Sequence, residues 1–191
     1  MGSPAHVRRA ERRAYFSASG RLLIFQRQGP AEQCDQMYVM GVDGGGLHRV
    51  SSGRGRTTCG YFYDGDRRIF YASTEHAGGD CPPRPDWVMN VDGSDQHQVT
   101  HLPGASFAPY FHPDGRRIIF SSNYKSPESR DFDLYLVNAD GTGLEQVTTA
   151  PGFDAFPMFS PDGTHLVWAS NRHGTAPHET NIFLAEWVER P

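Results

Sequence analysis

The sequence predicts an all-β protein, a β-propeller of four four-stranded blades in which an N-terminal strand closes the last blade. Three observations support this prediction. A segment built on an aromatic residue recurs four times, 46 to 49 residues apart, at Phe16, Phe62, Phe111 and Phe159. A second strand-like segment follows each copy, and no part of the chain shows a helical period of apolar residues. A repeat of roughly 40–50 residues that holds four strands is typical of a propeller blade.

The first half of the repeat contains two strands joined by a tight turn. Its four copies align without gaps at residues 14–25, 60–71, 109–120 and 157–168. The turns of the last two copies read Pro-Asp-Gly, and glycine adopts the positive φ of a tight hairpin at no steric cost. The flanking residues are rich in Ile, Val, Phe and Tyr, which favours strands of a half-buried sheet.

The second half contains a third strand, an Asp-Gly turn and a short fourth strand. The third strands with their turns lie at residues 36–44, 86–93 and 133–141, and the fourth strands at 48–50, 98–100 and 146–148. The last copy, residues 181–187, is not followed by a fourth strand. We therefore expect residues 5–10 to supply this strand, because pairing the two ends of the chain removes an exposed sheet edge.

The repeat also predicts the domain organisation. We expect a single propeller domain over residues 1–191, with units at about 14–55, 56–104, 105–152 and 153–188. A ring closed within one chain is a monomer. The alternative is a homodimer, in which two chains form one eight-bladed ring and exchange the terminal strand.

Two segments of the repeat resemble a known family. Residues 159–172 and 134–148 are similar to the repeat of TolB-type, WD-like β-propellers, and the resemblance extends from about residue 14 to 187. Such propellers serve as binding scaffolds, as enzyme domains and as parts of envelope assemblies, so the resemblance implies a fold and leaves the function open. It also implies a periplasmic or secreted location.

The chain departs from the family pattern at several positions. It has four repeats where the family commonly has six or more. Ala18-Ser19-Gly20 and Asp64-Gly65-Asp66 stand where Pro-Asp-Gly is expected. His112 replaces the usual serine before this turn, and we expect its side chain to be a hydrogen-bonded turn residue.

Composition and charge exclude several classes of protein. Hydrophobic residues make up 37% and charged residues 21% of the chain, which is typical of a globular protein. The net charge of −4 and the isoelectric point near 6.1 give no electrostatic reason to expect nucleic acid as a partner. No apolar run approaches the length of a membrane span, about 18 residues. The first 20 residues lack the apolar centre of a signal peptide.

The long loops are the expected location of the functional site. Strand direction alternates within a blade, so both kinds of tight turn lie at one end of each sheet and the long loops lie at the other. Loops on a rigid scaffold commonly carry function. The candidate residues of this ligand-binding face are His76, Asp80, Arg130, Asp154, His173, His178 and Glu179.

The three histidines among these candidates, His76, His173 and His178, are candidate metal ligands, because they could converge on the central channel and hold a divalent cation. No motif fixes their geometry, and solvated loop residues are the alternative, so no cofactor and no catalytic residue is assigned. The three cysteines, Cys34, Cys59 and Cys81, lie on the loop end of the first two units. A disulfide between two of them is expected in an oxidising compartment, and the sequence does not say which pair forms it.

Two functional hypotheses remain after these considerations. The first is a binding or scaffold propeller that presents its loop face to a peptide, a protein or a small ligand. The alternative is a metal-assisted hydrolase or lyase with its site at the mouth of the channel. The absence of any catalytic motif above background favours the first.

Overall fold

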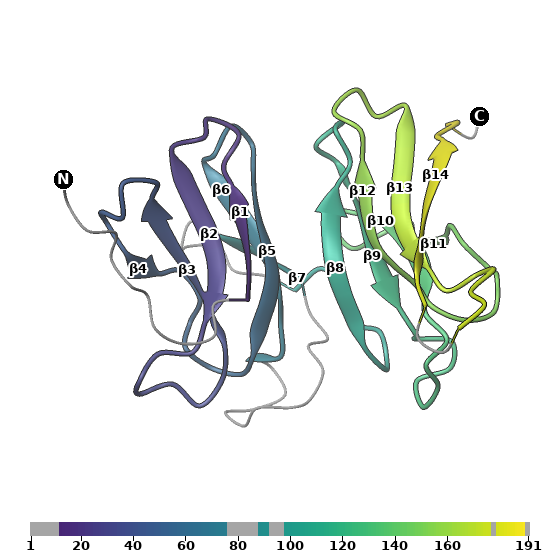
Figure 1. Cartoon of the computed structure of the whole chain (residues 1–191), viewed down its shortest axis with the longest axis horizontal. Helices are drawn as coiled ribbons and strands as arrows, with labels where there is room; N and C mark the ends of the chain where they lie inside the picture. Colours follow the sequence, from purple (N-terminus) through teal and green to yellow (C-terminus); the bar gives the residue numbers. More distant parts are fainter. Residues whose placement is uncertain (1–11, 76–87, 92–97, 177–178, 190–191) are drawn as a thin grey trace. The chain divides into compact units, whose positions relative to one another are not determined.

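The computed structural model describes residues 12–75, 88–91, 98–176 and 179–189, and there the chain forms four antiparallel β-sheets (Figure 1). Sheet 1 contains β1 (Arg12–Phe16), β2 (Leu22–Arg27), β3 (Gln36–Gly41) and β4 (His48–Arg49). Sheet 2 contains β5 (Thr57–Tyr63), β6 (Arg68–Ser73) and β7 (Val88–Val91). Sheet 3 contains β8 (Ser106–Phe111), β9 (Arg117–Ser122), β10 (Asp133–Asn138) and β11 (Glu145–Gln146). Sheet 4 contains β12 (Asp154–Phe159), β13 (His165–Ser170) and β14 (Asn181–Glu186).

The sheets are grouped into two compact units, with sheets 1 and 2 in the first and sheets 3 and 4 in the second. The all-β class is therefore confirmed. The number of blades in a closed ring stays a prediction, and residues 5–10, the expected closing strand, lie outside the described part of the chain. Residues 98–100, where the sequence predicts a fourth strand for sheet 2, are not in a strand. Within the described ranges, no helix is long and apolar enough to span a membrane.

In sheets 1 and 3 the two tight turns lie at the same end, as the alternation of strand direction predicts. In sheet 3 the amide of Ala139, in the Asp-Gly turn, donates a hydrogen bond to the carbonyl of Arg116 in the neighbouring turn, at 2.8 Å. In sheet 1 the amide of Val42 donates to the carbonyl of Arg21 in the same way, at 3.0 Å. We call this the turn end of a sheet and the opposite one the loop end.

The first strand of every sheet contains a β-bulge at the same position of the repeat. The register shifts between Arg12 and Ala14 in sheet 1 and at the corresponding places in the other three sheets. The extra residue of sheets 2, 3 and 4 has a positive φ, at Cys59 (54°), Ala108 (52°) and Phe156 (57°). None of these is glycine, so the left-handed conformation is held by the surrounding structure rather than by local preference.

Apolar packing between consecutive sheets forms the core of each unit. In the first unit, one buried cluster joins Ile24, Met37 and Val39 of sheet 1 with Ile69 and Tyr71 of sheet 2. Met37 and Val39 are two residues apart on β3, because only alternate side chains of a strand face the same neighbouring sheet.

The second unit uses the same positions of the repeat. Its cluster joins Ile119, Leu134 and Leu136 of sheet 3 with Leu166 and Trp168 of sheet 4. These side chains are at most 8% exposed. The repeat seen in the sequence is therefore a repeat of the contact between one sheet and the next.

Backbone and turn contacts join consecutive sheets at both ends. At the loop end, the amide of Thr57 donates to the carbonyl of Asp35 at 2.9 Å, and Asp154 donates to Phe132 at 2.7 Å. At the turn end of the first unit, the Asp66 carboxylate accepts hydrogen bonds from the amides of Ala18 and Ser19 at 2.7 and 3.0 Å. The departures from Pro-Asp-Gly in the first two repeats thus bond to each other.

We expect the substitution Leu134→Ala to lower the free energy of unfolding by about 2–5 kcal/mol, because it opens a cavity between sheets 3 and 4. Urea unfolding monitored by circular dichroism measures the change. The control is Leu144→Ala, at a side chain that is 37% exposed, with an expected change below about 1 kcal/mol. Equal losses in the two variants would contradict the packing described here.

Candidate functional site

The predicted site residue Asp154 is a buried structural carboxylate. It is 1% exposed and forms an ion pair with the guanidinium of Arg172. The same guanidinium lies 5.7 Å from the ring centre of Trp168 and 5.4 Å from that of Phe183. The pair therefore anchors the end of β13 onto the sheet, and the Asp154 carboxylate is not presented to solvent.

The other described candidates at the loop end, Arg130, His173 and Glu179, differ from Asp154 in exposure and in their contacts. Arg130 and His173 are exposed, and the His173 ring lies 6.1 Å from the ring of Phe183. The Glu179 carboxylate accepts hydrogen bonds from the amides of Thr175 and Ala176, at 2.8 and 3.0 Å. The hydrogen bond from the Thr175 amide makes the largest contribution to lowering the pKa of Glu179. These contacts are all within residues 175–179, so the carboxylate holds its own loop.

His76, Asp80 and His178 lie outside the described residues. Within the described ranges, no three His, Cys, Asp or Glu side chains are placed to hold a metal ion. The channel metal and the shared ligand-binding face stay predictions.

The cysteines differ in their surroundings. Cys34 is buried and takes part in a disulfide bond. Cys59 is buried at the bulge of β5, and its sulfur lies 3.5 Å from the hydroxyl of Thr58. Cys81 lies outside the described residues, so the pairing stays a prediction.

A polar residue directly after the second strand holds the long loops of the second unit. The Asn123 side chain accepts a hydrogen bond from the amide of Ala105 at 2.7 Å and donates to the carbonyls of Pro127 and Ser129 at 3.0 and 2.9 Å. At the equivalent position of the next repeat, Asn171 accepts from the amide of Phe153 at 2.8 Å. These loops are therefore tied to the sheet at their first residue.

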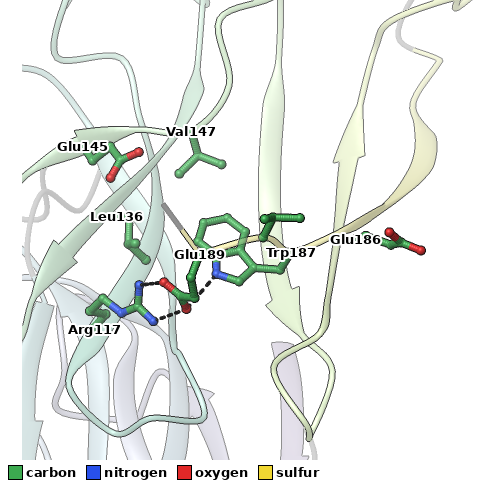
Figure 2. A pocket seen from close by; sticks show the side chains of 8 residues that line it. Arg117, Leu136, Glu145, Val147, Glu186, Trp187 and Glu189 are labelled. Carbon is green, nitrogen blue, oxygen red and sulfur yellow. Dashed lines mark hydrogen bonds and ion pairs between the residues drawn. The ribbon is translucent and has the colours of Figure 1, made fainter. Parts of the chain in front are cut away.

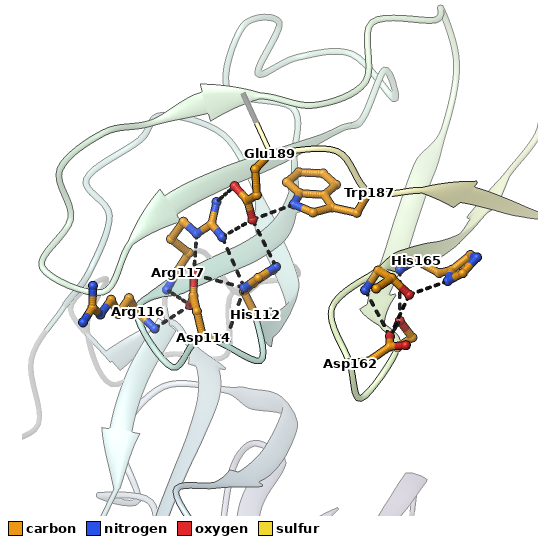
Figure 3. Close-up of polar contacts among 10 residues, drawn as sticks. His112, Asp114, Arg116, Arg117, Asp162, His165, Trp187 and Glu189 are labelled. Atoms are coloured by element: carbon orange, nitrogen blue, oxygen red, sulfur yellow. Dashed lines mark hydrogen bonds and ion pairs between the residues drawn. The ribbon is translucent and has the colours of Figure 1, made fainter. Parts of the chain in front are cut away.

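The turn end of the second unit carries a network of charged side chains (Figure 3). Arg117 lies at its centre, where its Nε donates to the Asp114 carboxylate at 2.7 Å. The two terminal nitrogens of Arg117 donate to the two oxygens of Glu189, at 2.8 and 2.6 Å. The indole nitrogen of Trp187 donates to Glu189 at 3.1 Å. This two-point guanidinium–carboxylate contact holds the segment after β14 against sheet 3.

His112 is a buried residue in contact with the network. It is the hydrogen-bonded turn residue that the sequence predicts. It is 7% exposed, and its Nδ1 accepts a hydrogen bond from the amide of Asp114 at 3.2 Å. Its Nε2 lies 3.7 Å from a Glu189 oxygen. Its ring packs edge-on against Phe159, with 4.5 Å between ring centres.

These contacts shift the pKa values of both carboxyl groups. The hydrogen bonds from Arg117 hold the pKa of Glu189 at about 2. Burial raises the pKa of Asp114, but hydrogen bonds from the Arg116 amide and from Arg117 outweigh it, so the pKa lies below its usual value. Both carboxylates are therefore ionised at neutral pH, and the pKa of Arg117 is raised in turn.

A pocket of about 350 Å³ opens beside this network (Figure 2). It is lined by Arg117, Leu136, Glu145, Val147, Glu186, Trp187, Val188 and Glu189. Arg117, Leu136 and Glu145 belong to sheet 3, and Val147 follows its last strand. The other four side chains come from the end of β14 and the residues after it. Three glutamates and one arginine make the lining negative, and aliphatic groups with one indole supply its apolar surface.

The sequence did not predict this pocket, which lies at the turn end and not among the long loops. Trp187 is the last residue of the strand-like segment 181–187, and Glu189 lies beyond the predicted fourth unit, so the repeat pattern gives neither residue a functional place. The one signal was His112, since a histidine in place of the usual serine indicates a special contact at that turn.

A family model and several solved structures match the chain. Residues 84–180, half of the chain, match the model of the TolB β-propeller domain. A TolB-type protein of Agrobacterium tumefaciens superposes with a TM-score of 0.68 at 20% identity, over 90% of this chain and 59% of that protein. TolB of Acinetobacter baumannii gives a TM-score of 0.67 at 19% identity, over 88% of this chain and 39% of that protein.

A puromycin-hydrolysing peptidase of Mycobacterium tuberculosis gives a TM-score of 0.64 at 17% identity, over 93% of this chain and 29% of that protein. At these identities the solved structures show a shared fold. The chain spans less than two thirds of each of the three proteins. No protein with a curated description matches the sequence.

We expect Glu189→Gln to lower the free energy of unfolding at pH 7 by about 0.2–1 kcal/mol, because the Glu189 side chain is 57% exposed and its ion pair is screened by solvent. The folded-state pKa of about 2 lies below the ordinary 4.5, so this stabilisation is present above 4.5 and is lost as the pH falls toward 2. Urea unfolding at pH 7 and at about pH 3 measures the difference between variant and wild type.

The control is Glu186→Gln, which makes the same change of charge at an exposed glutamate of the pocket. It should change stability less at pH 7. A deficit in Glu189→Gln that is as large in acid as at neutral pH would contradict the assignment.

Proposed function

Because this chain belongs to the TolB β-propeller domain family, we propose that it is a binding protein whose pocket at the turn end takes an arginine or lysine side chain of a peptide or protein. The observation that carries this proposal is the composition of the pocket, in which Glu145 and Glu189 lie beside apolar side chains, while the Glu186 side chain extends away from them (Figure 2). A cationic side chain with an aliphatic stem has the matching chemistry.

Each part of such a side chain has a counterpart in the lining. The aliphatic stem would pack along Leu136 and Val147, as arginine and lysine stems commonly do on apolar surfaces. The charged head would lie near Glu145 and beside the Trp187 indole, whose face attracts cations. Arg117 does not repel the ligand strongly, because Asp114 and Glu189 neutralise it.

The network behind the pocket supports binding rather than acid–base chemistry. His112 does not line the pocket, and its ring packs on Phe159. Its contacts hold Asp114, Arg117 and Glu189 in one arrangement before any ligand arrives, which lowers the cost of ordering the site on binding.

The disulfide at Cys34 supports the expectation of a periplasmic or secreted location, because disulfides persist in oxidising compartments. An exported binding domain is therefore the function that we propose. The long loops are a second surface for a partner, and their candidate residues stay as proposed from the sequence.

We expect labelled glycine-rich pentapeptides with a central arginine or lysine to bind more tightly than the same peptides with leucine or glutamate. Fluorescence polarisation measures the affinities, and added salt should weaken binding of the cationic peptides. The substitution Glu145→Gln should reduce the affinity for the arginine peptide about two- to fivefold, as expected for one partly exposed charge.

The matched control is Glu128→Gln, which removes an equal charge from an exposed position at the loop end. It should leave the affinity unchanged. If peptides with arginine and glutamate bind equally, or if both variants weaken binding alike, the pocket is not the recognition site.

A further inference from the structure

Sheet 4 has an apolar face that the described residues leave exposed. Ile182 and Leu184 on β14 are 75% and 69% exposed, and Met158 on β12 is 46% exposed. The strand register places them together, since Val167 on β13 pairs with Leu184 on one side and with Met158 on the other. The face therefore crosses all three strands of the sheet.

The equivalent positions of the repeat are buried in the other sheets that the structure describes in full. Ile182 corresponds to Met37 and Leu134, which are 1% and 0% exposed. Leu184 corresponds to Val39 and Leu136, which are 4% and 5% exposed.

Val167 is also more exposed than its equivalents, because it is partly buried whereas Ile24 and Ile119 are both 0% exposed. Those equivalents form the surface on which the next sheet packs within each unit. The chemistry of the exposed face thus indicates what covers it, namely another sheet of the same repeat.

We propose that the exposed face of sheet 4 binds sheet 1 of a second copy of this chain. In each contact, the second sheet uses a different set of repeat positions from the first. These positions are Ile69 and Tyr71 in sheet 2, and Phe159, Leu166 and Trp168 in sheet 4. Their equivalents in sheet 1 are Phe16, Leu23 and Phe25. Phe16 is 70% exposed and Leu23 is partly exposed, while Phe25 is already buried.

The two faces are different and complementary, so the contact is head-to-tail. Such a contact leads to a ring when the rotation closes. Two copies supply eight sheets, and propellers of four to eight blades are known. The TolB structures that match are longer than this chain, which covers 59% and 39% of them, so further sheets are consistent with the fold.

Light scattering coupled to size exclusion tests the proposal on the full chain. The wild type should have twice the mass of the 21.3 kDa chain. The double substitution Ile182→Glu/Leu184→Glu, and separately Phe16→Glu, should reduce the mass to that of one chain. Leu144→Glu, which places a charge at an exposed apolar residue of the turn end, should leave the dimer intact.

Mixing the two monomeric variants distinguishes this contact from others. Ile182→Glu/Leu184→Glu keeps the face of sheet 1, and Phe16→Glu keeps the face of sheet 4, so the mixture should form a dimer through one contact. A contact between two identical faces cannot be restored in this way. If the charged double variant does not keep its β-sheet circular dichroism, Ile182→Ser replaces it.

A wild type that has the mass of one chain at all concentrations would overturn the proposal. In that case, a large loss of stability in both charged variants would indicate that sheet 4 packs on sheet 1 of its own chain. A wild-type dimer that survives all the charged substitutions would also overturn it. Peptide binding to the pocket is measured separately and does not depend on these results.

Discussion

Apolar packing of one sheet on the next is the constraint on which the rest of the structure depends. Because side chains alternate along a strand, the first sheet of each unit offers one set of residues to the second sheet, and the second sheet offers a different set in return. Ile24, Met37 and Val39 form one such set, and Ile119, Leu134 and Leu136 repeat it. The strand order, the turns and the joints at both ends are consistent with this single contact used again.

Much of the fold could be predicted from the sequence because its signals are local. Alternating apolar residues and glycine at tight turns, such as Gly115 and Gly163 with φ of 68° and 73°, act within a few residues. The bulges could not be predicted in this way. Cys59 and Ala108 are not residue types that favour a positive φ, so their conformation is held by the surrounding structure.

The candidate site was harder to predict because it depends on contacts between distant parts of the chain. Residue type suggested a ligand role for Asp154, but its partner, Arg172, lies 18 positions further on and makes it a structural anchor. The pocket requires Glu189 to reach Arg117, 72 positions away. No pattern in the sequence connects those two residues.

Packing and the pocket are coupled through Phe159. This side chain is 2% exposed in the contact between sheets 3 and 4, and its ring also supports His112 and Trp187, at 4.5 and 5.0 Å between ring centres. Trp187 in turn donates to Glu189, which lines the pocket. A ligand that binds the proposed pocket of the folded protein would also stabilise the contact between the two sheets, since whatever binds only the folded form adds to its stability. The proposed binding pocket and the packing of this unit therefore share the same few side chains.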